Sequence, residues 1–172
     1  MNRAAPRWST SERETETGAV ESRQWITLPS AFVAVDDDGA RGLGRRYLAE
    51  VARFSHGLVR PRPEPNGVAL VLAGVVPLLR FDSPAVGVEN GQVECRYAIR
   101  GGALVARPGG SLAISQRPGV ELELVVAGYF PRLGGSTRRR SFRRALYTAI
   151  QARAHRAVGR RFLEHAAGEA TS

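Results

Sequence analysis

The first part of the chain is polar, and large apolar residues become frequent only after residue 24. Residues 1–22 consist mostly of polar and charged residues, with Ser, Thr, Glu and Arg prominent. Such a segment buries too little apolar surface to offset the entropy that is lost when it becomes ordered. We therefore predict a disordered N-terminal tail over residues 1–22, a single domain over 23–168 and a C-terminal tail over 169–172.

From residue 24 onward, the spacing of apolar residues predicts short strands and two helices. Apolar residues recur at helical spacing over Leu43–Phe54 and again over Phe142–Ala167. Between these segments, short apolar runs are separated by turns rich in Gly, Pro and Asn, which is typical of an antiparallel meander. The expected strands lie at 25–28, 31–35, 68–72, 75–81, 85–88, 92–99, 103–106, 111–115 and 120–128, and an extended connector is expected at 61–67.

Two of the expected strands alternate strictly between apolar and charged residues. Val93, Cys95 and Tyr97 share one face of their strand, and the charged residues between them share the other. In residues 120–124, the valine and the two leucines are expected to face inward and the two glutamates to face water. One side of the sheet is therefore apolar and needs a cover.

The last helix is expected to be that cover. Ser141 is a suitable N-cap, and the residues that follow it contain no proline as far as Ala167. Apolar residues recur at every fourth position from Phe142 to Phe162, and Gly159 weakens the helix by about 1 kcal/mol relative to alanine. We predict an α+β fold in which an antiparallel β-sheet meander packs on a long C-terminal helix.

The composition indicates the cellular compartment of the protein. Its one cysteine, Cys95, excludes an intrachain disulfide and a cysteine-rich metal site, and it suits a reducing compartment. The longest apolar run, Gly67–Phe81, is shorter than the ~20 residues of a spanning helix, and the polar N-terminus lacks the apolar stretch of a secretory signal. The sequence therefore predicts a cytoplasmic protein without a transmembrane segment.

The positive charge is concentrated near the C-terminus. All 25 basic residues are arginines, and ten of them lie after residue 131, where only two acids balance them. Five crowd the expected start of the last helix, where positive charge is unfavourable: Arg138, Arg139, Arg140, Arg143 and Arg144. This segment predicts either contact with an anion, such as phosphate, nucleic acid or a lipid headgroup, or a solvated loop with no partner.

No other group of residues indicates catalysis, a metal or a cofactor. His155 and His165 lie roughly 15 Å apart along the last helix, too far to share a metal ion, and structural or surface roles are expected for all three histidines. Residues 36–38 are expected to form a turn rather than a metal loop, and Glu121 and Glu123 lie on the side assigned to solvent. We predict no catalytic residue, no metal site and no cofactor.

The order of the expected elements is a strand, a helix, several antiparallel strands and one long helix. Over roughly residues 24–167, this order resembles the helix-grip fold of the START and polyketide-cyclase-like (SRPBCC) superfamily. The resemblance rests on element order and not on a motif, and it implies a pocket for a hydrophobic small molecule between the sheet and the last helix. The candidate lining residues, which suit a solid core equally well, are Cys95, Tyr97, Leu122, Leu124, Leu146 and Ile150.

Three functions are compatible with these features. The leading hypothesis is a non-catalytic domain that binds a hydrophobic small molecule in a cavity between the sheet and the C-terminal helix. An alternative is a binding module that engages nucleic acid or an anionic membrane through the arginines of residues 138–144. A third is an interaction protein that docks an acidic partner, and the oligomeric state is left open.

Overall fold

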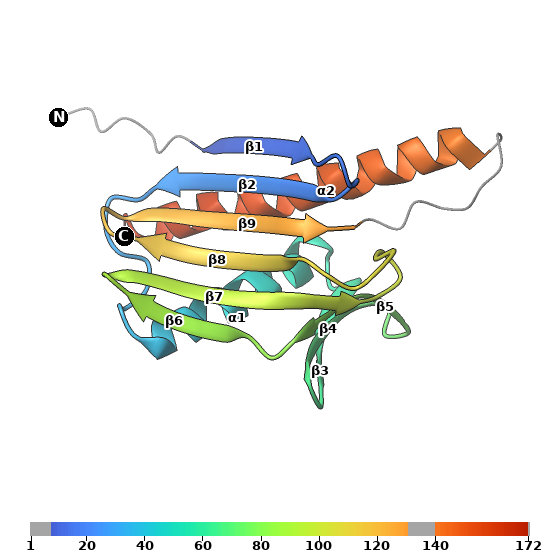
Figure 1. Cartoon of the computed structure of the whole chain (residues 1–172). Coiled ribbons are helices and arrows are strands. Elements are labelled where there is room, and N and C mark those ends of the chain that lie inside the picture. Colours follow the sequence, from blue (N-terminus) through green and yellow to red (C-terminus); the bar gives the residue numbers. More distant parts are fainter. Residues whose placement is uncertain (1–7, 131–139, 172) are drawn as a thin grey trace.

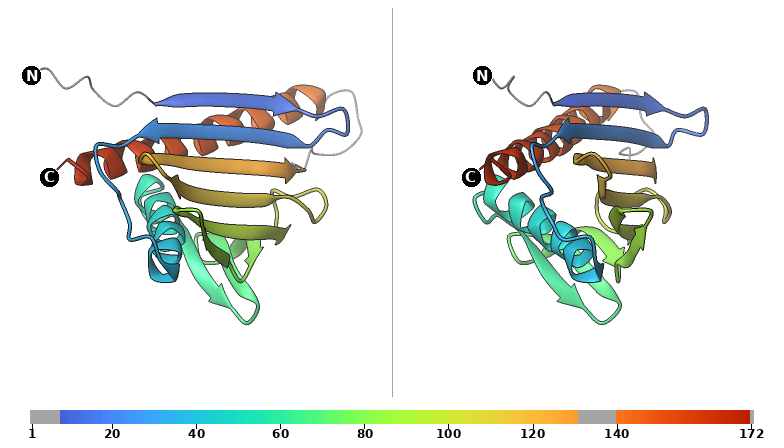
Figure 2. Two further views of the ribbon diagram at one scale, coloured as in Figure 1. Left: turned by 60° about the vertical axis from the view of Figure 1, so that its left-hand side comes forward. Right: turned by 90° about the vertical axis from the view of Figure 1, so that its left-hand side faces the viewer.

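The computed structural model describes the backbone of residues 8–130 and 140–171, and the side chains of residues 8–130 and 153–171. Within this part of the chain, nine strands form one antiparallel sheet, and two helices cover one face of it (Figures 1 and 2). The strands are β1 (Ser9–Glu14), β2 (Val20–Thr27), β3 (Val59–Glu64), β4 (Gly67–Leu72), β5 (Val76–Asp82), β6 (Ala85–Glu89), β7 (Gln92–Gly101), β8 (Ser111–Arg117) and β9 (Glu121–Tyr129). The helices are α1 (Asp37–Phe54) and α2 (Arg140–Glu169), so the predicted α+β arrangement of an antiparallel sheet with a C-terminal helix is confirmed.

The sheet brings the two ends of the chain together. Its strands follow the order β1-β2-β9-β8-β7-β5-β4-β3, and β6 pairs with the first half of β7. Because β2 lies beside β9, residues from the start and the end of the sequence share one inner face (Figure 1). The predicted hairpin turn at Asn90-Gly91 is also present, with both residues at positive φ.

The expected N-terminal tail is instead a β-hairpin from residue 9 onward. Residues 9–14 of β1 pair with residues 20–25 of β2 without interruption. This pairing satisfies backbone N–H and C=O groups and needs no apolar side chains, and Glu12 also forms an ion pair with Arg156 of α2. The prediction of disorder is therefore wrong for residues 9–22, because composition measures side-chain burial and not the pairing that a neighbouring strand offers.

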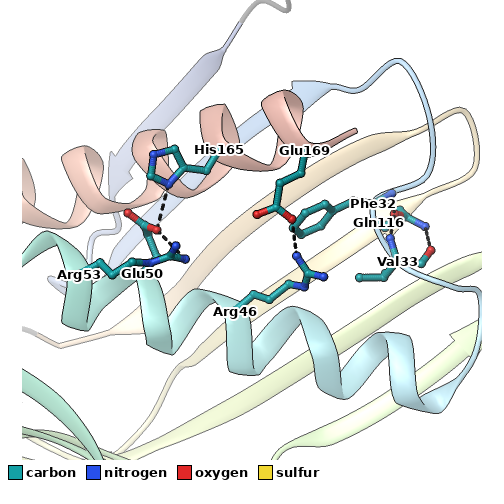
Figure 3. Close-up of polar contacts among 8 residues, drawn as sticks. All are labelled: Phe32, Val33, Arg46, Glu50, Arg53, Gln116, His165 and Glu169. Atoms are coloured by element: carbon teal, nitrogen blue, oxygen red, sulfur yellow. Dashed lines mark hydrogen bonds and ion pairs between the residues drawn. The ribbon is translucent and has the colours of Figure 1, made fainter. Parts of the chain in front are cut away.

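Two segments that were expected to be strands have no regular strand structure. Residues 31–35 form a loop, in which the backbone N–H groups of Phe32 and Val33 donate to the side-chain oxygen of Gln116 at 2.7 and 3.0 Å (Figure 3). Residues 103–106 form turns, while the proline-rich connector expected at 61–67 contributes most of β3. Prolines are tolerated in β3 because it lies at the edge of the sheet, where a missing N–H costs little.

Two glycines allow the helices to lie close to the sheet. A Cβ atom at Gly44 of α1 would lie 2.4 Å from the hydroxyl oxygen of Tyr97 and 2.6 Å from the sulfur of Cys95. A Cβ atom at Gly159 of α2 would lie 2.5 Å from the side-chain amide nitrogen of the fully buried Gln24. Gly159 thus weakens α2 as an isolated helix, but it permits the close crossing of α2 over β2.

A buried carboxylate joins α1 to α2. The side chain of Glu50 has no exposed surface, and its carboxylate lies 3.1 Å from both Arg53 and His165 (Figure 3). Arg161 of α2 lies 3.0 Å from the other oxygen of this carboxylate. One turn before Glu50 on α1, Arg46 pairs with Glu169 at 2.5 Å. The C-terminal half of α2 is therefore held alongside α1.

The outer face of the sheet differs from the prediction at one residue. Leu122 and Leu124 face the core as expected, but Glu123 between them is only 2% exposed rather than facing water. Arg23 of β2 and Arg117 of β8 both pair with its carboxylate, the latter at 2.6 Å. The alternation is correct, and the burial arises because arginines of the two neighbouring strands cover Glu123.

Candidate functional site: an apolar cavity

A cavity of about 340 Å³ lies between the inner face of the sheet and the two helices. Nearly all of its surface is apolar, as the alternation of the strands dictates for side chains on the inner face. The sheet contributes, among others, Val20, Leu70, Phe81, Ile99, Leu112 and Val126, and the helices contribute Tyr47, Val51, Phe54, Ala154 and Val158.

The cavity arises where α1 ends. The contacts of Glu50 and Arg46 hold α2 along α1 only as far as the residues around Arg161. After Phe54, the chain turns through Gly57, whose φ is +78°, and continues into β3. Ala154 and Val158 of α2 precede Arg161, and they line the cavity together with Val51 and Phe54 from the last turn of α1.

Three polar side chains form one corner of this cavity, which we call the polar corner: Glu12, Ser22 and His155. Glu12 and Ser22 are directly opposite each other on β1 and β2, and His155 comes from α2. The carboxylate of Glu12 is paired with Arg156. By contrast, Ser22 Oγ and His155 Nε2 are buried and have no hydrogen-bond partner among the residues that the structure describes.

The other hydroxyl groups of the wall for which contacts are known are already engaged. Ser55 Oγ lies 3.1 Å from the carbonyl oxygens of both Ala52 and Val59, either of which can accept its one hydroxyl hydrogen, and it accepts from the Val59 N–H at 3.0 Å. Tyr129 donates to the Leu104 carbonyl oxygen at 2.7 Å, and burial raises the pKa of Tyr47 well above its ordinary value, so that its phenol stays protonated. Among the fully buried polar side-chain atoms of this wall in the described residues, those without a hydrogen-bond partner are therefore Ser22 Oγ and His155 Nε2.

The environment of His155 keeps its imidazole neutral. Removal from water lowers the pKa of His155 from 6.5 to about 4, and the negative charge of Glu12 offsets this only in part. The unfolded chain binds a proton at His155 below about pH 6.5, whereas the folded protein resists protonation until about pH 4. The contribution of this residue to stability is therefore complete above pH 6.5 and is lost as the pH falls toward 4.

This difference gives a prediction for the pH dependence of stability. Between pH 7.5 and pH 5, the free energy of unfolding of the wild-type protein should fall by about 2 kcal/mol more than that of His155→Phe. Urea titrations of both proteins at the two pH values measure the difference. Equal losses in the two proteins would show that His155 is protonated in the folded state.

The structure places the residues predicted for a pocket as follows. Cys95, Tyr97, Leu122 and Leu124 are all buried, but none of them is among the residues that line the cavity. Cys95 and Tyr97 lie beneath α1 at Gly44. The side chains of Leu146 and Ile150, like those of the five arginines predicted to bind an anion (Arg138, Arg139, Arg140, Arg143 and Arg144), lie outside the described residues.

The polar corner was missed by the sequence analysis, which assigned Ser22 to a tail and His155 to a structural or surface role. The sequence position of His155 could have indicated that it faces the core. His155 precedes Val158 by three residues and Phe162 by seven, so the three share one face of the helix, and both apolar residues are buried. Residues 36–38, which were expected to form a turn, instead begin α1: Asp36 is its N-cap, and its carboxylate accepts from the Gly39 N–H at 2.7 Å.

Within residues 8–130 and 140–171, no group of three or more described His, Cys, Asp or Glu side chains could hold a metal ion. Neither helix of this part of the chain is long and apolar enough to cross a membrane. Comparison of the chain with family models, with curated proteins and with solved structures found no match. The cavity is therefore the candidate functional site of the described residues.

Proposed function

We propose that the protein binds an apolar small molecule in the cavity between the sheet and its two helices. The observation that carries the proposal is the cavity itself, about 340 Å³ with an almost wholly apolar wall. Ligand sites of this kind are concave, apolar and furnished with a few polar groups that orient the ligand. The polar corner supplies such groups at one place in the wall.

The apolar wall of the cavity supports this proposal. Protein interiors are close-packed, so a concavity of about 340 Å³ beside the core departs from ordinary packing. The neighbouring core is closely packed, since Leu43, Ile114, Leu122 and Leu163 are all less than 2% exposed. A bound apolar molecule would make contacts with this wall and remove its own surface from water.

The geometry favours binding over catalysis. The polar corner contains a serine, a histidine and a glutamate, which are the residue types of a hydrolytic triad. A nucleophile and its base must lie within hydrogen-bond reach of each other, yet within the described residues Ser22 Oγ and His155 Nε2 form no hydrogen bond. Glu12 is engaged by Arg156, and within the described residues it forms no hydrogen bond with His155.

The resemblance to the helix-grip fold agrees with this proposal. In that fold, a curved sheet wraps a long final helix around an apolar cavity. Here α2 lies across the inner face of the sheet, and Ala154 and Val158 of α2 line the cavity. We therefore also propose that the chain has the helix-grip fold, because that fold encloses an apolar cavity in which a ligand can bind.

The proposal predicts that a small apolar alcohol stabilises the protein. In calorimetric titrations, 1-nonanol should bind saturably with one molecule per chain and with a negative heat-capacity change, because apolar surface becomes buried. At a free ligand concentration one hundred times the dissociation constant, the free energy of unfolding should rise by about 2.7 kcal/mol. Urea titrations with and without 1-nonanol measure this change, and unchanged stability at every concentration would contradict the proposal.

A further inference from the structure

We propose that the ligand of the cavity is an uncharged molecule with an apolar body and one hydroxyl group, and that Ser22 and His155 bind this hydroxyl. This inference rests on the proposed function and names the chemical class of its ligand. It comes from the distribution of free and engaged polar groups around the cavity.

Two buried groups in the wall are able to bind a ligand hydroxyl. Ser22 Oγ and His155 Nε2 are both buried, and neither has a hydrogen-bond partner within the described part of the chain. Leaving such a group unpaired costs about 1–3 kcal/mol, so most buried polar groups are paired in folded proteins. Glu12 links the two positions, since it is the cross-strand neighbour of Ser22 and acts electrostatically on His155.

A hydroxyl group suits this pair better than other polar groups. A serine hydroxyl donates one hydrogen bond and accepts others, and a neutral imidazole nitrogen either donates or accepts, depending on the tautomer. A ligand hydroxyl is also both donor and acceptor, so it can satisfy Ser22 and His155 together in either tautomer. An ether oxygen only accepts, so it can pair with both groups only if both donate.

The charges of the polar corner disfavour a charged ligand. Arg156 forms an ion pair with the carboxylate of Glu12 and so balances its negative charge. His155 is neutral at physiological pH. Among these described groups, no positive charge remains for a ligand carboxylate, and burying an unpaired charge beside an apolar wall is costly.

The volume of the cavity sets the size of the ligand. A water molecule, which has one non-hydrogen atom, occupies ~30 Å³ in the liquid. At this volume for each non-hydrogen atom, the cavity of 340 Å³ holds about eleven such atoms. A medium-chain alcohol or a compact cyclic alcohol has this size. Because a longer molecule would have to leave the cavity at one end, affinity should stop rising once the chain exceeds this length.

The test compares three ligands of equal size by calorimetric titration of the full-length protein at pH 7.5. 1-Nonanol, 1-methoxyoctane and octanoate have the same number of non-hydrogen atoms and differ in the polar end. We expect 1-nonanol to bind about fivefold more tightly than the ether, the effect of one net hydrogen bond, and at least about tenfold more tightly than the ionised octanoate.

The variants Ser22→Ala and Ser22→Ala/His155→Phe test the assignment to residues. Ser22→Ala removes an unpaired buried hydroxyl, so it should leave the free energy of unfolding of the ligand-free protein unchanged or raise it. It should reduce the preference for the alcohol over the ether, and in the double variant the two ligands should bind within about twofold of each other. If the double variant does not fold, the single variant and the ligand series on the wild-type protein remain sufficient.

The possible outcomes separate this inference from the proposed function. Equal binding of the alcohol and the ether by the wild-type protein would overturn the inference, and so would tightest binding of octanoate. Either result would leave the cavity as a binding site. If none of the three ligands binds, the proposed function fails and the inference fails with it.

Discussion

Replacement of Val126 by tryptophan should strongly weaken ligand binding while the protein stays folded. Val126 lies on β9, is partly buried and lines the cavity from the sheet side. An indole at this position would occupy the space that the ligand needs, and the apolar wall would receive it without loss of a hydrogen bond. We expect the affinity for 1-nonanol to fall by at least roughly tenfold, which corresponds to about 1.4 kcal/mol, as measured by calorimetric titration.

The neighbouring residue provides a matched control for this variant. Val125 precedes Val126 on the same strand, so its side chain points to the opposite face of the sheet, and it does not line the cavity. Val125→Trp should therefore leave the affinity for 1-nonanol unchanged within about twofold. Equal losses of affinity in the two variants would mean that the ligand does not occupy the cavity. Circular dichroism of both variants checks that the fold is retained.

The second large effect is expected at the contact between α1 and the sheet. Gly44→Val should lower the free energy of unfolding by roughly 4 kcal/mol, since a Cβ at this position already overlaps the hydroxyl oxygen of Tyr97 and the sulfur of Cys95. The tyrosine ring and the cysteine are both buried, so neither can move aside without disturbing the core. Urea denaturation at pH 7.5 measures the loss.

Gly42 on the same helix is the control for this effect. A Cβ at Gly42 would meet nothing closer than a methyl group of Val33 at 4.0 Å. Gly42→Ala should therefore raise stability by up to about 1 kcal/mol through helix propensity, whereas Gly44→Ala should lower it. If both alanine variants were more stable than the wild-type protein, this would contradict the close approach of α1 to β7 at Gly44.

The sequence predicted the correct faces of the strands but the wrong place along them for the cavity. On β7, the predicted residues Cys95 and Tyr97 are buried, and the next inward residue, Ile99, lines the cavity. On β9, Leu124 is buried, and the next inward residue is Val126. Alternation fixes which residues face inward, but the extent of the solid core depends on which strand residues α1 and α2 cover, and this is a tertiary property.

The polar corner could not be predicted from local patterns. Ser22 and His155 are far apart in the sequence and line the same cavity because α2 crosses closely over β2. Moreover, β1 and the start of β2 are polar, and they are held in place by backbone pairing within the sheet. Hydrophobic periodicity identifies strands that bury one face, but it gives little signal for an edge strand such as Ser9–Glu14.

The most direct test of the account is to locate the ligand among the methyl groups of the core. In a spectrum of ¹³C-methyl-labelled valine and leucine residues, titration with 1-nonanol should shift Leu112 and Val126 saturably at one equivalent. Leu122 and Leu124, which are buried away from the cavity, should shift much less. Shifts confined to exposed methyl groups such as those of Val75, or the absence of any saturable shift, would contradict the claim that this cavity binds an apolar molecule.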